Sequence, residues 1–512
     1  MNSRLRSLRF LPLLLLTPLI AWPQSTAPQA PSPESVALTK EPAIIQNLDV
    51  RARFENDGRQ TYEIAIRVKI QSESGRSANG LLVFPYSSGN ESLKIEYVRV
   101  RKADGSVVDT PLDAVQDVTS EVARSAPEYT DQHEKHVAVK GLSVGDILEY
   151  ATTAMLLKPY ADGQFWSAFN FSRDTITLRE QFLINVPKTR PVKVLSPSFI
   201  PDIVDMGDRR VYQFSWSYLK RDLEEKKTEV DAEPRPPDVQ LTSFTSWNEV
   251  AAWYNVLQRA RLQITPEVRA KAQELVAGKQ TDNEKIQAIY YYVSQKVRYI
   301  GISLGQGRFA PHAAAEVLAN QFGDCKDKHT LLAALLQAAG IDSYAALIGS
   351  NTKIQKDFPT PGLFDHVISV VPQGHSFLWL DTTPGVAPFA MLQQPLRDKL
   401  ALIVRNDGSG LLDTTPAALP FPAFQHFTMD GNLSADGNFD GKARMEVRGD
   451  VELFLRLAFR NTPEVSWKDL AQRLSFMTGF GGTVDDVSAG SPDDSSQPFW
   501  YAYSYHRPQY GD

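Results

Sequence analysis

The sequence predicts a multidomain protein in which a central α+β domain lies between two β-rich domains. Hydrophobic residues alternate with polar ones through much of residues 45–225, which is typical of β-strands. Residues 246–400 begin with helical repeats and continue with strands, without strict alternation of the two, which favours an α+β domain. Alternation and Asp-Gly turn signals return over residues 415–512.

The overall composition is that of a globular protein. Of its 512 residues, 42% are hydrophobic and 22% are charged, and the formal net charge is -6. This length leaves room for two to four domains. The small negative charge gives no electrostatic reason to expect a nucleic acid partner. The composition does not point to a particular oligomeric state.

The first 22 residues have the pattern of a secretory signal. Three arginines precede an apolar run over residues 10–21, and this run is short for a membrane span. We therefore expect residues 1–22 to direct export across an inner membrane to the periplasm, leaving no integral membrane span after cleavage. No clean A-x-A site follows, so an uncleaved N-terminal anchor is the alternative. Residues 23–44, rich in proline, serine and glutamine, are predicted to be a disordered lead-in.

Residues 45–225 are predicted to form an all-β sandwich of no evident chemistry. Hydrophobic residues alternate along 64–70, after an Asn-Asp-Gly turn, and along 176–186. Asp104-Gly105 is a strong hairpin signal. We find no set of catalytic residues in this region.

Two histidines of this region, His133 and His136, lie in a polar stretch with a spacing that could suit a metal. A zinc site would need at least a third ligand, and none is evident nearby. We therefore interpret the stretch as a solvated loop.

Residues 226–245 are predicted to be a linker, because they contain three prolines and no periodicity. Three helices are expected beyond it, each with an N-cap signal. The N-cap residues are Ser246, Thr265 and Thr281. Three apolar strands are expected later in the domain, at 343–348, 366–371 and 377–381.

Residues 415–512 are predicted to form a second β-rich domain. A helix is expected over 467–480 and a strand over 499–503. The sequence stops a few residues after this strand, so we expect the domain to be incomplete. Its turn signals are the Asp-Gly pairs at 430–431, 436–437 and 440–441.

The stretch Gly-Asp-Cys-Lys-Asp-Lys-His organises the chain. Hydrophobic residues at helical spacing follow it as far as Gly340, so Asp324 is predicted to be a helix N-cap and Cys325 to lie in the first turn. The positive end of the helix, together with Lys326 and Lys328, favours the thiolate form of this cysteine. A nucleophile would then be available at neutral pH.

Cys325 is the only cysteine in the sequence, so it has no intramolecular disulfide partner and no C-x-x-C redox pair. Free cysteines are most often small buried hydrophobic residues, and that is the alternative here. The polar and charged neighbours of Cys325 argue against it. In an exported protein an exposed thiol is also liable to oxidation. We therefore predict a catalytic nucleophile.

A nucleophilic thiol needs a base and a group that orients the base. His366 opens an apolar strand and Asp381 closes another, so two adjacent antiparallel strands would bring the imidazole and the carboxylate together. Asp365 is the competing orienting group, but successive strand residues point to opposite faces. His329 is the competing base, one helical turn after Cys325, and we expect it to pack behind the thiol.

Three motifs together resemble the bacterial transglutaminase-like superfamily, which has Cys, His and Asp in this order. The motifs are Gly323-Asp324-Cys325-Lys326-Asp327, Phe364-Asp365-His366-Val367 and Leu380-Asp381-Thr382-Thr383-Pro384. Residues 45–225 are similar to the domain of unknown function that commonly precedes this core. The C-terminal segment looks like the β-domain that commonly follows it.

The resemblance implies a papain-like core and a thioester acyl-enzyme. Cys325 would be the nucleophile, His366 the general base and acid, and Asp381 the orienting group. The oxyanion hole would combine the Cys325 backbone N–H with one side-chain donor. Candidates for this donor, where animal transglutaminases use a tryptophan, are Tyr299, Gln306 and Gln321. Such a site requires no cofactor and no metal.

We therefore predict an exported cysteine enzyme that acts on amide or peptide bonds of a protein or peptide, for example an envelope peptide. The acyl group would pass to water, as in a peptidase or amidase, or to an amine, as in a transglutaminase. Both stay open, because exclusion of water decides between them. The alternative class is a non-catalytic binding or scaffolding protein of the cell envelope that keeps the same fold.

Overall fold

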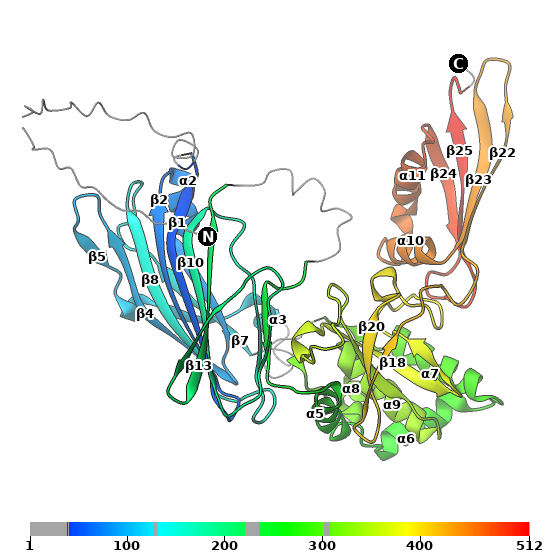
Figure 1. The fold of residues 1–512 in the computed structure, drawn as a ribbon. Coiled ribbons are helices and arrows are strands. Elements are labelled where there is room, and N and C mark those ends of the chain that lie inside the picture. Colours follow the sequence, from blue (N-terminus) through cyan, green and yellow to red (C-terminus); the bar gives the residue numbers. More distant parts are fainter. Residues whose placement is uncertain (1–37, 39, 126–130, 221–234, 302–307, 511–512) are drawn as a thin grey trace, which may run out of the picture.

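The structure is a computed structural model that describes residues 38, 40–125, 131–220, 235–301 and 308–510. Figure 1 shows three parts along the chain: a large sheet, then helices packed on a second sheet, then a smaller sheet with two helices. The protein is thus multidomain and β-rich with a helical core region, as predicted. The predicted signal peptide lies outside the described residues.

The N-terminal part is built on an eight-stranded sheet. Its strands are β1 (Ala43–Phe54), β2 (Gln60–Ile70), β4 (Glu91–Arg101), β5 (Val107–Asp109), β8 (Ile147–Leu156), β10 (Thr177–Pro187), β12 (Asp202–Met206) and β13 (Arg209–Tyr218). They lie in the order β12-β13-β10-β1-β2-β8-β4-β5. The predicted Asn-Asp-Gly turn joins β1 to β2, and Gly58 there has a φ of 91°, which glycine adopts without strain.

Two three-stranded sheets pack on opposite halves of the large sheet. One is β3 (Leu81–Ser87), β7 (Gln132–Ala138) and β6 (Gln116–Thr119), and the other is β11 (Lys193–Leu195), β14 (Val239–Thr242) and β9 (Trp166–Phe169). Each contributes to its own apolar core with the large sheet. Two short helices, α2 (Glu73–Asn79) and α3 (Glu121–Ser125), complete this part.

The end of the predicted linker is part of the fold. Residues 226–234 lie outside the described residues, but 239–242 form β14, in which all four residues are buried. Val239 and Leu241 fill the core beneath the large sheet. The prolines end at residue 237, so a strand can begin directly after them, and the linker prediction was wrong for this segment.

The central part begins with helices. They are α5 (Trp247–Arg259), α6 (Pro266–Val276), α7 (Asp282–Lys296), α8 (Ala314–Asn320) and α9 (Cys325–Ala338). The side chains of Ser246, Thr265 and Thr281 each accept a hydrogen bond from a first-turn N–H, so the three predicted N-caps are confirmed. Helix α8 was not among the predicted helices, and its N-cap, Ala313, makes no side-chain capping bond.

A five-stranded antiparallel sheet packs against these helices. Its strands are β17 (Tyr344–Ile348), β18 (His366–Gln373), β19 (Ser376–Leu380), β20 (Leu400–Val404) and β21 (Gly410–Thr414). They lie in the order β19-β18-β17-β20-β21, which confirms the three predicted strands and extends the sheet beyond residue 400. Helix α9 packs across β18, and α6, α7 and α8 surround it. A two-residue pair, β15 (Arg298–Tyr299) and β16 (Phe322–Gly323), leads into α9.

The C-terminal part is a four-stranded sheet with two helices. The strands are β22 (Phe424–Leu433), β23 (Phe439–Arg448), β25 (Phe499–Arg507) and β24 (Thr483–Ala489), and the helices are α10 (Asp450–Arg460) and α11 (Trp467–Met477). The predicted helix and strand are confirmed as α11 and β25. Of the three turn signals, only 436–437 is a turn. Gly431 and Gly441 lie opposite each other within β22 and β23, and a Cβ on Gly431 would lie 2.5 Å from a carbonyl oxygen, so close backbone approach requires them.

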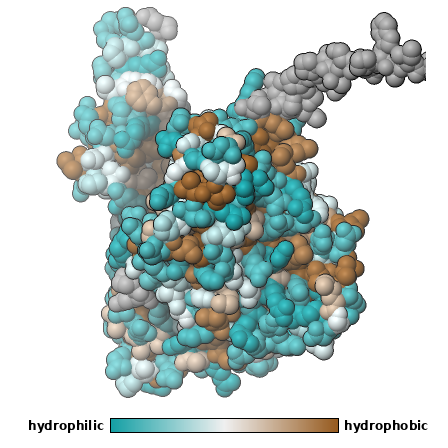
Figure 2. Space-filling view, turned by 90° about the vertical axis from the view of Figure 1, so that its left-hand side faces the viewer, coloured by the Kyte–Doolittle hydropathy of each residue, from teal (hydrophilic) through white to brown (hydrophobic). Residues whose placement is uncertain are grey.

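The surface mixes hydrophobic and hydrophilic residues on the face shown in Figure 2. Exposed hydrophobic side chains include Ile203, Val204 and Met206 on β12. Among the described residues, the structure contains no helix long and apolar enough to cross a membrane.

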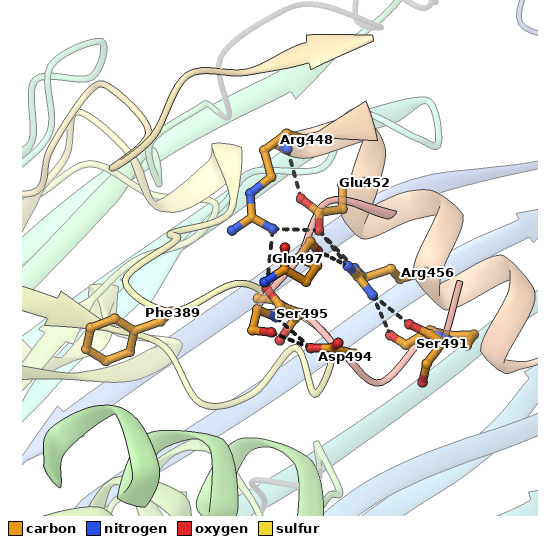
Figure 3. Close-up of polar contacts among 12 residues, drawn as sticks. Phe389, Arg448, Glu452, Arg456, Ser491, Asp494, Ser495 and Gln497 are labelled. Carbon is orange, nitrogen blue, oxygen red and sulfur yellow. Dashed lines mark hydrogen bonds and ion pairs between the residues drawn. The ribbon is translucent and has the colours of Figure 1, made fainter. Parts of the chain in front are cut away.

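A buried charge cluster fixes helix α10 to the loop before β25 (Figure 3). Glu452 is 0% and Arg456 is 1% exposed. The Glu452 carboxylate accepts hydrogen bonds from Nε of Arg456 at 2.9 Å and Nη1 of Arg448 at 3.1 Å. Arg456 also donates to the carbonyl oxygen of Ser491 at 2.9 Å. Because these groups are desolvated, the cluster is stable only while every member keeps its partner.

Replacing Glu452 with alanine is therefore expected to lower the free energy of unfolding by about 3–5 kcal/mol, because Arg456 would be left buried without its carboxylate. Denaturant unfolding of the C-terminal part, followed by the fluorescence of Trp467 and Trp500, measures this. Glu446→Ala is the matched control, since Glu446 is 37% exposed and pairs with Arg444 at 3.4 Å; its cost should stay below about 1 kcal/mol. Equal effects of the two variants would contradict the buried cluster.

Candidate active site

Cys325 is the first residue of helix α9. The Asp324 carboxylate accepts hydrogen bonds from the backbone N–H groups of Lys326 and Asp327, and the Asp327 carboxylate binds the N–H of Asp324 in return, so the predicted N-cap is confirmed as a capping box. A Cβ at Gly323 would lie 2.6 Å from Cβ of Asp327, which leaves room only for glycine. This cap holds the cysteine over the positive end of the helix.

The side chain of Cys325 lines a cavity of about 420 Å³. Cys325 is 7% exposed, so the thiol is largely buried in the wall of this cavity. His366 and Val367, at the start of β18, and Tyr254, from α5, line the same space. Its volume falls within the range of small-ligand and peptide pockets.

Strands β18 and β19 bring His366 to Asp381. The strands pair with Ser369 opposite Leu380, and Asp381 follows directly after β19. Nε2 of His366 lies 3.3 Å from Oδ2 of Asp381. Oδ1 of Asp381 accepts hydrogen bonds from the N–H and the hydroxyl of Thr383 at 2.9 and 2.8 Å. The carboxylate is therefore fixed in orientation and turns one oxygen to the imidazole.

The second ring nitrogen is left for the cysteine. Because Nε2 faces Asp381, Nδ1 is the nitrogen left to interact with Cys325, whose contact with the ring helps to raise the pKa of His366. The structure thus brings together Cys325, His366 and Asp381, the three residues predicted from the sequence.

The electrostatics of the pair favour a charged imidazole. Burial alone would lower the pKa of His366, but the charge and hydrogen bond of Asp381, followed by the contacts with Cys325, raise it well above its ordinary value. Burial likewise opposes ionisation of Asp381, yet the charge and hydrogen bond of His366, with the bonds from Thr383, lower the pKa of this carboxyl. An imidazolium beside the sulfur is the arrangement that stabilises a thiolate.

The raised pKa of His366 predicts how the stability of the protein depends on pH. Because the pKa of His366 is raised in the folded state, protonated His366 stabilises the fold. This stabilisation is complete below the pKa of about 6.5 in the unfolded chain, and it is lost as pH rises through the pKa of the folded state. The difference in melting temperature between the wild type and His366→Gln should therefore shrink as pH rises from about 6. Calorimetry at several pH values measures it. A difference that stays constant or grows would contradict the raised pKa.

The two competing residues are bound elsewhere. His329 is buried, with Nε2 at 2.6 Å from Nε2 of Gln258 and Nδ1 at 2.7 Å from the hydroxyl of Ser369. Burial lowers its pKa to about 3, so it stays neutral and packs behind the nucleophile. Asp365 uses both carboxylate oxygens on Ser350, at 2.6 Å from its N–H and 2.8 Å from its hydroxyl. It therefore fixes a loop and does not orient the base.

The lysines beside Cys325 are bound by other groups. The ammonium of Lys326 pairs with the carboxylate of Asp324. Nζ of Lys328 donates to the carbonyl oxygens of Ser294 and Val297 at 3.1 and 2.7 Å, at the end of α7, and burial lowers the pKa of Lys328 to about 7. The two lysines therefore do not face the cysteine as expected, since each is bound to other groups.

The three candidates for the second oxyanion donor differ in their position relative to the site. Gln321 is committed elsewhere, since its amide donates to the hydroxyl of Tyr292 at 3.0 Å. Gln306 lies outside the described residues. Tyr299 lies near the site: burial, followed by the charges of Cys325 and Asp324, raises its pKa. Its side chain is also 43% exposed.

Tyr254 is a site residue that sequence reasoning missed. It is 2% exposed and packs in the same apolar cluster as Cys325. Among the described residues, its hydroxyl has no hydrogen-bond partner. Burial, followed by the charges of Cys325 and Asp324, raises the pKa of Tyr254 well above its ordinary value, so the hydroxyl keeps its proton and can donate it in a hydrogen bond.

The two histidines of the N-terminal part lie on β7, so the loop predicted there was wrong. His133 contacts Asp117 at 3.0 Å and His136 contacts Glu134 at 2.8 Å, and these are separate pairs. Over the described part of the chain, no group of three or more His, Cys, Asp or Glu side chains is placed to hold a metal ion.

Comparison with known proteins connects this fold and site to a family. The sequence profile of a domain of unknown function, DUF3857, matches residues 56–221, and that of the transglutaminase-like superfamily matches residues 269–348. Among curated proteins, none matches the chain.

One solved structure is similar to this chain over most of its length. The crystal structure of a proposed protease from Parabacteroides distasonis covers 91% of this chain and 93% of its own, with 13% identity and a TM-score of 0.60. At this identity the match shows a shared fold alone. An M1 zinc metallopeptidase from Deinococcus radiodurans, with 7% identity over 40% of this chain and 42% of its own, has a TM-score of 0.22, which is too low to support an argument.

The fold and the two profiles define a multidomain protein with a transglutaminase-like core. The chain is a transglutaminase-like protein that carries a DUF3857 domain ahead of that core.

Proposed function

We propose that this protein is an exported cysteine enzyme that forms a thioester acyl-enzyme on amide or peptide bonds. The observation that carries the proposal is that Cys325 and His366 line one cavity and that Asp381 lies 3.3 Å from the His366 ring. The core is papain-like in this proposal: a helix supplies the nucleophile and an antiparallel sheet supplies the base and its orienting group. The DUF3857 part is a sandwich of the large sheet with the two small ones.

The reaction begins with the thiolate of Cys325 beside protonated His366. The sulfur attacks the carbonyl carbon, a C–S bond forms and the carbonyl oxygen takes the negative charge. When this intermediate collapses, the C–N bond breaks and the leaving amine takes the proton from Nδ1 of His366. Asp381 holds the ring with Nε2 protonated, so Nδ1 is the nitrogen that exchanges the proton.

The thioester is released by a second nucleophile. His366 takes a proton from water or from an incoming amine, the C–S bond breaks and the thiolate returns. Water as the acceptor gives a peptidase or amidase, and an amine as the acceptor gives a transglutaminase. The substrate in this proposal is a protein or peptide of the envelope, as expected for an exported chain.

Tyr254 is the proposed second donor of the oxyanion hole, beside the backbone N–H of Cys325. Two facts support this role: its buried hydroxyl has no hydrogen-bond partner in the described part of the chain, and Tyr254 packs in the same apolar cluster as Cys325. A buried hydroxyl without a partner costs stability. The oxyanion formed during the reaction would accept a hydrogen bond from this hydroxyl. A donor that is held in place before the reaction stabilises such an anion.

Replacing Tyr254 with phenylalanine is expected to slow acylation by about 10²- to 10³-fold, because one donor to the oxyanion is lost. The same change should leave the protein as stable as before or up to about 1–3 kcal/mol more stable, because the unpaired hydroxyl is removed. Burst kinetics and thermal unfolding measure the two effects. Unchanged acylation, or slower acylation together with a clear loss of stability, would contradict the proposed donor.

A burst assay tests the proposed function. With p-nitrophenyl acetate in excess, one p-nitrophenol per protein should be released rapidly, and intact mass spectrometry should show one acetyl group, mapped to Cys325. Cys325→Ser should abolish both. Adding glycine ethyl ester then separates the two acceptors: a faster second phase with N-acetylglycine ethyl ester as product indicates acyl transfer to amines, and acetate alone indicates hydrolysis. Absence of a burst in the wild type would favour a non-catalytic envelope scaffold.

A further inference from the structure

We propose that the DUF3857 domain forms one wall of the acyl-donor site and selects polypeptides with an apolar or aromatic side chain next to the reacting carbonyl. The inference rests on the proposed function. It assigns a role to the DUF3857 domain, which has no role in the proposed reaction. The cavity at Cys325 lies between the two parts of the chain. The residues that line it from the N-terminal part are Pro85, Tyr86, Ser87, Glu91, Gln132 and Tyr160.

The wall is preformed, because its polar groups are bound within their own domain. The hydroxyl of Tyr86 donates to Asp117 at 2.7 Å, and that of Ser87 donates to Asp131 at 2.6 Å. The backbone N–H of Ser87 donates to the carboxylate of Glu91 at 2.9 Å. The end of β3 therefore presents a fixed shape to the cavity, and a ligand meets little that must first be ordered.

Aromatic packing keeps this wall in place relative to the nucleophile. Nε1 of Trp253, on α5, donates to the carbonyl oxygen of Tyr160 at 2.9 Å. The ring centroid of Trp166, on β9, lies 5.5 Å from that of Trp253 and 5.7 Å from that of Phe309, and Phe309 is 8% exposed. Buried aromatic contacts of this kind resist separation of the two parts, so the cavity keeps both walls.

The chemistry of the lining favours an apolar side chain over a basic one. Two charged groups near Cys325 already have partners: Lys326 pairs with Asp324, and Asp365 binds Ser350. The other lining residues on this side are mostly apolar or aromatic: Trp253, Tyr254, Arg308, Phe309, Leu347, Phe364 and Val367. Arg308 lies 5.2 Å from the ring centroid of Phe309 and adds a positive charge to the cavity, so a basic substrate side chain would lose water and be repelled, whereas an apolar one gains by burial.

Two probes that both alkylate Cys325 separate recognition from reactivity. Iodoacetamide is small and needs no wall, whereas benzyloxycarbonyl-Ala-Phe chloromethyl ketone places the Phe side chain next to the reacting carbonyl in the acyl-donor site. The test variant is Pro85→Trp, which adds bulk to the cavity. Val83→Trp is the matched control, because Val83 is 44% exposed, lies two residues earlier on the same face of β3 and does not line the cavity. Circular dichroism checks that both variants keep the fold.

We expect Pro85→Trp to slow the peptidyl probe about tenfold or more and to leave the iodoacetamide rate within about twofold of wild type. Val83→Trp should change neither rate. A probe with Lys in place of Phe should react at least about tenfold more slowly with the wild type. An unchanged peptidyl rate in Pro85→Trp, an equal slowing of both probes, or equal rates with the Phe and Lys probes would overturn the inference.

Failure of the proposed function has a different signature. In that case wild-type Cys325 would react with iodoacetamide no faster than a cysteine in an unfolded peptide, and no acetyl burst would appear. If the burst and the fast alkylation are both present while the wall variant has no effect, only the role of the DUF3857 domain is lost.

Discussion

Replacing His366 with alanine is expected to lower the acylation rate by about 10²- to 10⁴-fold, because the group that donates the proton to the leaving amine is lost. In the proposed mechanism the imidazole beside Asp381 also keeps the sulfur reactive, so the variant would lose this contribution as well. Single-turnover release of p-nitroaniline from a peptidyl p-nitroanilide, whose leaving group is an amine, measures this rate.

His375→Ala is the matched control for this variant. His375 is exposed in the turn between β18 and β19, so its loss removes an imidazole from the same hairpin without touching the site. It should acylate at the wild-type rate. Similar rates for the wild type and His366→Ala would contradict the role of His366 as the base.

Replacing Asp381 with asparagine is expected to lower turnover by about 10³- to 10⁴-fold while the fold is kept. The asparagine oxygen can still accept the bonds from Thr383. Its NH₂ group would then face Nε2 of His366, which must accept instead of donate, and the ring proton would move to Nδ1. That nitrogen could no longer take a proton from the cysteine.

Asp365→Asn is the control for this change, since Asp365 adjoins His366 but binds Ser350. Turnover and thermal unfolding are measured on both variants. Asp365→Asn should keep turnover close to that of the wild type, although it can loosen the loop. Loss of the fold in Asp381→Asn would mean that Asp381 is a structural residue, and full activity would mean that the tautomer of His366 does not depend on it.

Local signals made much of the core predictable. The cap at Asp324 and the end of α9 at Gly340, where φ is 80°, depend on neighbouring residues alone, so sequence reasoning found them. His366 and Asp381 could be paired because each is the polar end of an apolar strand. That inference needed only the assumption that consecutive strands lie side by side, which is common.

Features that depend on distant packing could not be predicted in the same way. Tyr254 falls at helical spacing from Val250 in an apolar stripe and looks like a core residue. Its unpaired hydroxyl becomes evident only when α5 is packed beside α9. The wall formed by Pro85 requires two domains to meet, and no local pattern encodes that contact. Lys328 was misjudged because its stem can turn the ammonium to the end of α7.

Two of the three Asp-Gly turns predicted in the C-terminal part were wrong. Asp-Gly pairs favour turns, but Gly431 and Gly441 lie within paired strands because their backbones approach closely. Glycine occurs both in turns and where two strand backbones approach closely. Only the register of β22 with β23 shows which of the two applies to Gly431 and Gly441.

The most direct measurement is the second-order rate of Cys325 alkylation by iodoacetamide between about pH 5 and 9, for the wild type, for His366→Ala and for the urea-unfolded chain. At about pH 6 we expect the folded wild type to react at least about tenfold faster than the unfolded chain, and His366→Ala to lose most of this advantage. A folded wild type that reacts no faster than the unfolded chain at any pH would contradict a thiolate stabilised by His366 at the helix start.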